Sequence, residues 1–118
     1  MVIAQFKTRA AEKREEKEIY NIWADTIKDR DNRECFICAT TYGLCSHHII
    51  PREHKEYLLL LDNGITLCLK HHKFSRNISA HNNPLAFFMW MDKYKPEIMK
   101  IARERMRKIL KDKEGIDI

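Results

Sequence analysis

The cysteines and histidines of this chain all lie in its central part, and their spacing constrains the fold more than any other feature. The sequence has 118 residues with 4 Cys and 6 His, all of them between positions 35 and 81. Cys35 and Cys38 form a CxxC pair, and Cys68 and His71 repeat the same spacing further along. Thiolates and imidazoles are the ligands that Zn²⁺ prefers, and structural zinc sites take four of them. These residues therefore predict a structural Zn²⁺ site that closes the intervening chain into a long loop.

Other uses of these cysteines fit the sequence less well. A disulfide needs an oxidising compartment, whereas the first ten residues are interrupted by charges and lack the apolar core of a signal peptide. A redox CxxC is expected beside a βαβ pattern, and none is visible. A C2H2 finger places about twelve residues between its second cysteine and first histidine, but only eight separate Cys38 from His47. Cys45 is either a small buried side chain or a substitute zinc ligand.

The length predicts one domain with a thin core, which a bound metal would help to stabilise. Charged residues make up 33% and apolar residues 44% of the chain, which is too apolar for disorder. The 3 Gly and 3 Pro disfavour a Gly-rich phosphate loop or a turn-rich all-β fold. No apolar run approaches the ~20 residues of a membrane span. We expect a soluble, intracellular chain with no membrane partner.

A helical arm, residues 1–34, precedes the centre. It holds eight basic and eight acidic residues, and its helix is expected from about Ala10 to Asp31. Its charged face is expected to be solvated, since solvation is the ordinary role of such a charge run. An apolar stripe on this helix is expected to contact the core or a second copy of the chain; its members are Ile19, Ile22, Trp23, Thr26 and Ile27.

A basic tail, residues 82–118, follows the centre and is expected to form two helices. It holds nine basic and six acidic residues. Asn83 and Pro84 fit an N-cap and first turn, and Pro96 is suited to open the second helix. The apolar run 85–91 is expected to pack on the centre. The basic side chains of the second helix are either soluble surface or contacts to nucleic-acid phosphates.

Two adjacent histidine pairs indicate a second use of histidine. His47 and His48 precede an apolar pair in a strand-like context, where neighbouring side chains point to opposite faces. His71 and His72 stand at the expected start of a helix, where neighbours diverge by about 100°. We therefore expect His71 to complete the zinc site and His72 to face another cavity. The pair Asn63-Gly64, between two apolar segments, predicts a turn.

With these motifs in view, residues 35–81 resemble the zinc-stapled HNH endonucleases of phages and bacteria. The resemblance rests on His48, Asn63 and His72 in the order His–Asn–His, framed by the two zinc half-sites. It implies an α+β fold with a small ββα-metal core, whose strands lie at about 44–50 and 65–67 and precede a helix bearing His72. It also implies that residues 1–118 form a single nuclease domain of arm, core and tail, in a cytoplasmic protein encoded by a bacterium or a phage.

The resemblance implies a role for each site residue. His48 corresponds to the general base, His47 to a metal ligand directly before it, and His72 to the second metal ligand. Asn63 corresponds to an asparagine that braces the loop and orients the base, and Arg52 is a candidate phosphate contact. The implied ligands of the structural zinc are Cys35, Cys38, Cys68 and His71.

The implied activity is metal-dependent hydrolysis of DNA phosphodiester bonds, by nicking or by double-strand cleavage. Its catalytic cation would be Mg²⁺, Mn²⁺ or Ni²⁺. Many members of the family have Asp where this chain has His47. Because Mg²⁺ prefers oxygen ligands and imidazole suits Mn²⁺ and Ni²⁺, we expect activity with these two metals at least equal to that with Mg²⁺.

DNA is the expected partner, and phage terminase subunits are a further one, because small phage nucleases of this family often act beside the packaging terminase. Two other functions stay open: a catalytically inactive zinc-stapled nucleic-acid-binding module, and an interaction subunit whose arm packs on a larger partner. The loop from Arg52 to Asp62 is expected to join the strands, with 58–61 in the core. Cys45, His54 and His81 have no assigned role, although either of these two histidines could contribute as a further metal ligand or lie at the surface.

Overall fold

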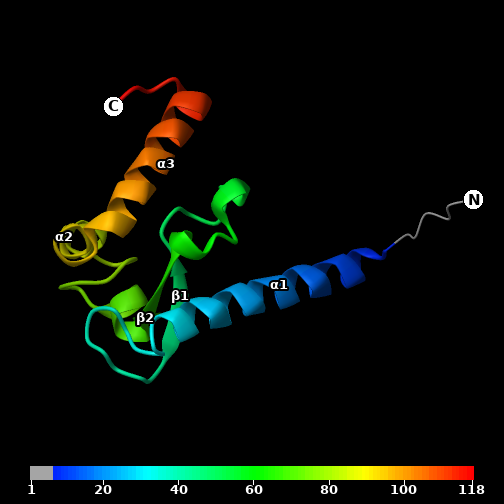
Figure 1. Ribbon diagram of the computed structural model, residues 1–118, viewed down its shortest axis with the longest axis horizontal. Helices are drawn as coiled ribbons and strands as arrows, with labels where there is room; N and C mark the ends of the chain where they lie inside the picture. The colour runs from blue at the N-terminus through cyan, green and yellow to red at the C-terminus, as the bar shows by residue number, and fades with distance from the viewer. Residues whose placement is uncertain (1–6) are drawn as a thin grey trace, which may run out of the picture.

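A small antiparallel sheet lies at the centre of the fold, and helices pack on both of its faces (Figure 1). The structure is a computed structural model that describes residues 7–118, so the first six residues of the arm lie outside it. The long helices and strands are α1 (Arg9–Arg30), β1 (Leu44–His48), β2 (Gly64–Cys68), α2 (Pro84–Tyr94) and α3 (Pro96–Glu114). Three short helical turns complete the order: η1 (Lys55–Tyr57) and η2 (Leu61–Asn63) between the strands, and the π-helical turn η3 (Lys70–Phe74) after β2.

The predicted α+β class and its two strands are confirmed, with slightly different strand ends. β1 and β2 pair antiparallel, with Leu44 opposite Cys68 and His48 opposite Gly64. Side chains alternate between the faces, and Ser46 on the α1 face donates a hydrogen bond of 2.7 Å from Oγ to the carbonyl of Ala24. The opposite face belongs to the main core, whose buried members include Ile65, Leu67, Phe87 and Met91.

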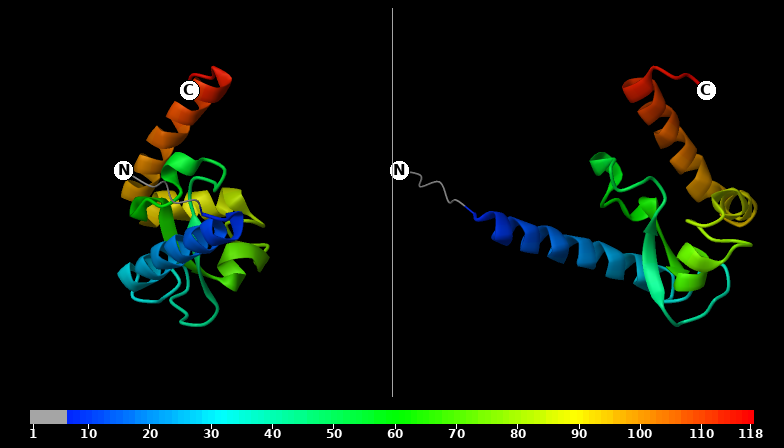
Figure 2. Two further views of the ribbon diagram at one scale, coloured as in Figure 1. Left: turned by 90° about the vertical axis from the view of Figure 1, so that its right-hand side faces the viewer. Right: turned by 180° about the vertical axis from the view of Figure 1, so that it is seen from behind.

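Only the C-terminal half of α1 packs on the sheet, and its N-terminal half projects away from it (Figure 2). Thr8 caps the helix by accepting a hydrogen bond from the amide of Ala11. Its buried residues are Trp23, Ala24 and Ile27. The predicted stripe is not buried at its N-terminal end, where Ile19 and Ile22 are 49% and 67% exposed, although Tyr20 between them contacts the His48 ring.

Gly64 permits the close approach of α1 to β2. A Cβ atom at this position would lie 2.5 Å from Cζ2 of Trp23 and 2.9 Å from Cδ1 of Ile27. The predicted turn at Asn63-Gly64 is wrong: Gly64 has extended backbone (φ −138°, ψ 148°) and begins β2. The absence of a side chain at Gly64 therefore allows α1 to pack closely on β2, and does not serve a turn.

We expect Gly64→Ala to destabilise the protein by about 3 kcal/mol, because the buried Trp23 ring must shift to admit the methyl group. Urea unfolding followed by tryptophan fluorescence measures the loss. Gly115→Ala is the control, since nothing lies within 4 Å of its Cβ position and only its φ of +66° is unfavourable to alanine. That control should cost about 1 kcal/mol, and equal losses in the two variants would contradict the packing argument.

The two tail helices begin where the sequence predicts. The Asn83 side chain accepts a hydrogen bond from the amide of Ala86 and caps α2, and prolines occupy the first turns of both helices. Much of the positive charge of α3 is neutralised by nearby carboxylates. The ion pairs are Arg103–Asp92, Arg105–Asp62, Lys108–Asp112 and Lys113–Glu56.

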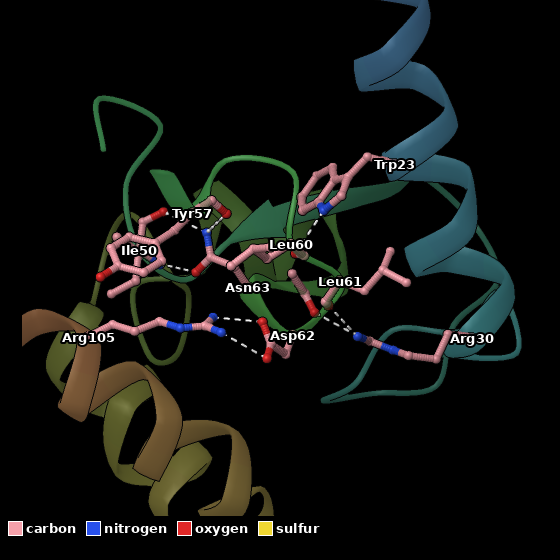
Figure 3. A network of polar contacts seen from close by, with 10 residues as sticks. Trp23, Arg30, Ile50, Tyr57, Leu60, Leu61, Asp62, Asn63 and Arg105 are labelled. Carbon is pink, nitrogen blue, oxygen red and sulfur yellow. Dashed lines mark hydrogen bonds and ion pairs between the residues drawn. The ribbon is translucent and has the colours of Figure 1, made fainter. Parts of the chain in front are cut away.

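The segment 49–63 joins the strands, as expected, but 58–61 is not core. Leu59, Leu60 and Leu61 are 44%, 40% and 48% exposed. The backbone of Leu60 and Leu61 is instead held by α1, since Trp23 Nε1 donates to the Leu60 carbonyl over 3.0 Å and an Arg30 guanidinium nitrogen donates to the Leu61 carbonyl over 2.6 Å (Figure 3). Across residues 7–118, none of the helices combines the length and the apolar character required to cross a membrane.

Candidate metal centres and active-site cleft

Four predicted ligands meet at the end of β2, and we call them the four-ligand cluster: Cys35, Cys38, Cys68 and His71. Their ligand atoms all lie within 4.8 Å of one another. Cys38 Sγ lies 3.8 Å from Cys68 Sγ, which in turn lies 3.4 Å from His71 Nδ1. A tetrahedral Zn²⁺ with bonds of about 2.3 Å to sulfur separates two sulfurs by about 3.8 Å. The cluster therefore could hold a metal ion, and its spacing fits zinc.

The local structure explains how two distant segments form this cluster. The chain around Cys35 folds into a tight turn with Ala39 in a left-handed conformation (φ 61°). The turn is attached to the sheet by the amide of Phe36, which donates to the carbonyl of Thr66 over 3.0 Å. Cys68 ends β2, and η3 then turns the His71 side chain back toward the thiols.

The thiols differ in how readily they ionise. Burial raises the pKa of Cys35, but hydrogen bonds from the backbone amides of Cys38, Cys68 and Ile37 outweigh it and leave the pKa below its usual value. Burial, together with the neighbouring Cys35, raises the pKa of Cys68 to about 11, although a hydrogen bond from the His71 backbone opposes the shift. A second thiolate at this place therefore needs a cation beside it, as a metal site would supply.

Three other histidines meet on the core-side face of the sheet, and we call His47, His72 and His81 the histidine trio. Their ligand nitrogens lie within 4.8 Å of one another, and Nε2 of His72 lies 3.0 Å from Nε2 of His81. Burial, followed by the other histidines, lowers the pKa of His47 to about 3. Burial, followed by His81 and Lys73, lowers the pKa of His72 to about 4. Both rings are therefore neutral at pH 7, which is the form that binds metal ions.

His81 joins the trio although no motif in the sequence marks it. The loop after η3 folds back on this turn, since the amides of Ala80 and His81 donate to the carbonyls of His71 and His72. These bonds carry the His81 ring to His72, nine residues earlier in the chain. The pairing depends on the loop path rather than on a residue spacing, so the sequence could not distinguish His81 from His54 as a further ligand.

Cys45 is not part of the four-ligand cluster but contacts the trio. Its Sγ lies 3.2 Å from the Leu67 carbonyl oxygen and 3.2 Å from Nδ1 of His72. A carbonyl only accepts, so the S–H donates to Leu67 and the sulfur accepts from Nδ1–H of His72. The lone pair of His72 is then on Nε2, which faces the other two histidines. Cys45 therefore orients a candidate metal ligand from behind.

His48 lies on the α1 face of the sheet, opposite to its neighbour His47. Its ring stacks on Trp23, with centroids 4.1 Å apart and planes at 7°. Nε2 lies 3.0 Å from the Leu58 carbonyl oxygen and must donate to it, so Nδ1 carries the lone pair. Burial, with a smaller contribution from Arg52, lowers the pKa of His48, although the bond to Leu58 opposes the shift. A neutral ring held in one tautomer is suited to accept a proton at Nδ1.

One cleft of about 530 Å³ brings the trio and His48 together. It follows the free edge of β1, so side chains from both faces of that strand reach it. Arg52 lines the cleft, and its guanidinium carbon lies 4.9 Å from the centre of the Tyr20 ring. Lys73 lines it as well, so two cationic side chains stand beside the histidines.

Asn63 lies behind the cleft and braces the loop that supports His48. It is 1% exposed, and its Oδ1 accepts from the amide of Ile50 over 2.7 Å. Its Nδ2 donates to the carbonyls of Ile50 and Tyr57 over 3.2 and 3.1 Å (Figure 3). His54 lies away from both clusters, with Nδ1 3.1 Å from Nζ of Lys113.

The structure thus places His47, His48, His72 and Arg52 on one cleft, with Asn63 behind it. The sequence did not predict the contacts of Tyr20 and Trp23 with the His48 ring, because these contacts depend on how α1 crosses the sheet.

Comparison with known protein families, with curated proteins and with solved structures finds no match for this chain.

Proposed function

We propose that this protein is a metal-dependent endonuclease that hydrolyses DNA phosphodiester bonds in the cleft beside β1. The observation that carries the proposal is the combination of the histidine trio with a separate, tautomer-fixed histidine, His48, in the same cleft. Hydrolysis of a phosphodiester requires a base for water and positive charge on the phosphate. The two groups of histidines, with Arg52 and Lys73 beside them, supply the ligands and the base for this chemistry.

The trio fits a divalent cation because its members offer neutral nitrogens that converge from three segments of chain. A cation bound there would act as a Lewis acid toward the phosphate and would stabilise the departing oxygen. His47, His72 and His81 would hold it, with Cys45 fixing the tautomer of His72. Its donors are all imidazoles, which favours Mn²⁺ or Ni²⁺ over Mg²⁺.

His48 Nδ1 takes the proton of the attacking water in the proposed reaction. The water oxygen forms a bond to phosphorus, and the bond from phosphorus to the 3′ oxygen breaks. The leaving 3′ oxygen takes up a proton from solvent water, and His48 later releases its proton to solvent, so the products have 5′-phosphate and 3′-hydroxyl ends, as the HNH resemblance implies. Arg52 binds a phosphate oxygen, and the Trp23 stack and the Leu58 carbonyl keep the His48 ring in place.

A structural Zn²⁺ in the four-ligand cluster is the second part of the proposal. Three thiols and one imidazole form the donor set of closed, structural zinc sites. The cluster connects the turn at Cys35 to the end of β2 and to η3, which carries His72. Zinc at this position would therefore fix one member of the trio indirectly.

Cleavage of supercoiled plasmid DNA tests the proposal. The wild-type chain should nick or linearise the plasmid, with Mn²⁺ or Ni²⁺ at least as effective as Mg²⁺. His81→Ala should raise the Mn²⁺ concentration needed for half-maximal cleavage at least about tenfold, because one of three ligands is lost. His54→Ala is the matched control, since this histidine lies outside the cleft, and it should behave as the wild type.

The metal screen also has results that contradict the proposal. Absence of cleavage with every metal, from a folded chain that still binds DNA, would leave a catalytically inactive nucleic-acid-binding module. Strict dependence on Mg²⁺ would contradict the role of an all-histidine site. An unchanged metal requirement in His81→Ala would remove this residue from the ligand set.

A further inference from the structure

A second groove, of about 590 Å³, runs between α1 and the segment 52–59. Tyr20 and Arg52 line both this groove and the active-site cleft, so the two hollows are adjacent. We call it the arm groove. Its charged lining consists of Lys13, Lys17, Arg52, Lys55 and one acid, Glu16.

The lysines of α1 in this groove lie on the same helix face as Tyr20, which also lines the cleft. Lys13 and Lys17 are four residues apart and Tyr20 is seven after Lys13, so the three share one face of the helix. Seven residues of α-helix span about 10 Å, the length of about three nucleotides along one strand of B-DNA. The arm groove therefore extends a cationic track away from the site where we place the cleaved bond.

The cations of the arm groove are available to a ligand. Within residues 7–118, no carboxylate oxygen lies within 4.0 Å of the nitrogens of Lys13, Lys17, Arg52 or Lys55. On α3, by contrast, four of the basic side chains form ion pairs with carboxylates. The arm as a whole has no net charge, which does not reveal the available lysines of the groove. Acids elsewhere on α1 pair with other bases, as Glu15 does with Lys7.

We propose that the arm groove binds the phosphate backbone of the DNA strand that flanks the cleaved bond, through Lys13, Lys17 and Lys55. Arg52, held against the Tyr20 ring, stands at the junction between the groove and the cleft. The inference rests on the proposed function and adds the path of the substrate. It assigns to the arm a binding role rather than a purely solvated surface.

Binding of a fluorescent 20-base-pair DNA duplex, measured by anisotropy without added divalent cations, tests the arm groove. The double variant Lys13→Gln/Lys17→Gln keeps good helix formers and removes two charges. It should weaken binding about tenfold near 0.1 M salt and lower the slope of log K against log salt by about two, because each phosphate contact contributes about 0.9. The matched control is Arg107→Gln/Lys111→Gln, another exposed i, i+4 basic pair, on α3. It should change affinity less than twofold.

The results separate the arm groove from the endonuclease proposal. If both double variants lose affinity equally, or the Lys13/Lys17 pair loses none, the groove proposal fails even where the wild type cleaves plasmid. If only the Lys13/Lys17 double variant loses DNA affinity, and the wild type does not cleave plasmid with any metal tested, the groove proposal stands and the endonuclease proposal fails. A dependence on the pair seen with an RNA duplex and not with DNA would overturn the groove proposal, and absence of any DNA binding by the wild type would overturn both. Circular dichroism confirms that each variant is folded.

Discussion

Cys68→Ser should leave a chain that no longer unfolds cooperatively at room temperature and no longer retains zinc. Structural Zn²⁺ sites contribute about 10–16 kcal/mol of apparent binding free energy at neutral pH, whereas a domain is stable by only about 5–15 kcal/mol. Cys68 is the last residue of a fully buried strand and is 5% exposed. Its loss would therefore remove a ligand and loosen β2, η3 and the Cys35 turn together.

Thermal unfolding by circular dichroism and zinc content by atomic absorption measure this effect. Cys45→Ser is the matched control, because this thiol lies outside the four-ligand cluster. It should keep one zinc per chain and a melting temperature close to that of the wild type. If Cys68→Ser retained one zinc and melted within a few degrees of the wild type, the cluster would not be a structural metal site.

Local spacing predicted the parts of the fold that depend on neighbouring residues. Two pairs at i, i+3 predicted which four side chains would meet, and the structure brings them together. The alternation of side chains along a strand predicted that His47 and His48 would point to different faces. The divergence of neighbours on a helical turn likewise separated His71, which joins the thiols, from His72, which joins the trio.

Features that depend on long-range packing were not predicted. Four consecutive leucines predicted a core segment, but three of their side chains are exposed, and the backbone carbonyls of this segment accept hydrogen bonds from His48, Trp23 and Arg30. The sequence predicted that Asn63 lies in a turn, whereas its side-chain amide is buried and holds the segment between the two strands by hydrogen bonds. In each case a tertiary hydrogen bond outweighs the local preference of the sequence. The ββα-metal core and the nuclease activity of this protein stay predictions.

His48→Ala should lower the rate of plasmid cleavage about 10²–10⁴-fold, the usual contribution of a general base. The expected loss is confined to the chemical step. His48 belongs to neither metal cluster, and the ring that it stacks on keeps its own hydrogen bond to the Leu60 carbonyl. Zinc content and DNA affinity should therefore stay within about twofold of the wild type, whereas the single-turnover rate at saturating Mn²⁺ falls.

His48→Gln separates the base from its surroundings, because the amide can still donate toward the Leu58 carbonyl but has no basic nitrogen to accept the proton. It should be as inactive as His48→Ala while keeping a melting temperature closer to that of the wild type. Trp23→Phe should instead retain a measurable part of the rate, since the ring stack persists and only the bond to Leu60 is lost. A His48→Ala variant that cleaves at more than about a tenth of the wild-type rate would mean that another group takes the proton from water. The stacked and tethered geometry of His48 would then serve only to hold the loop.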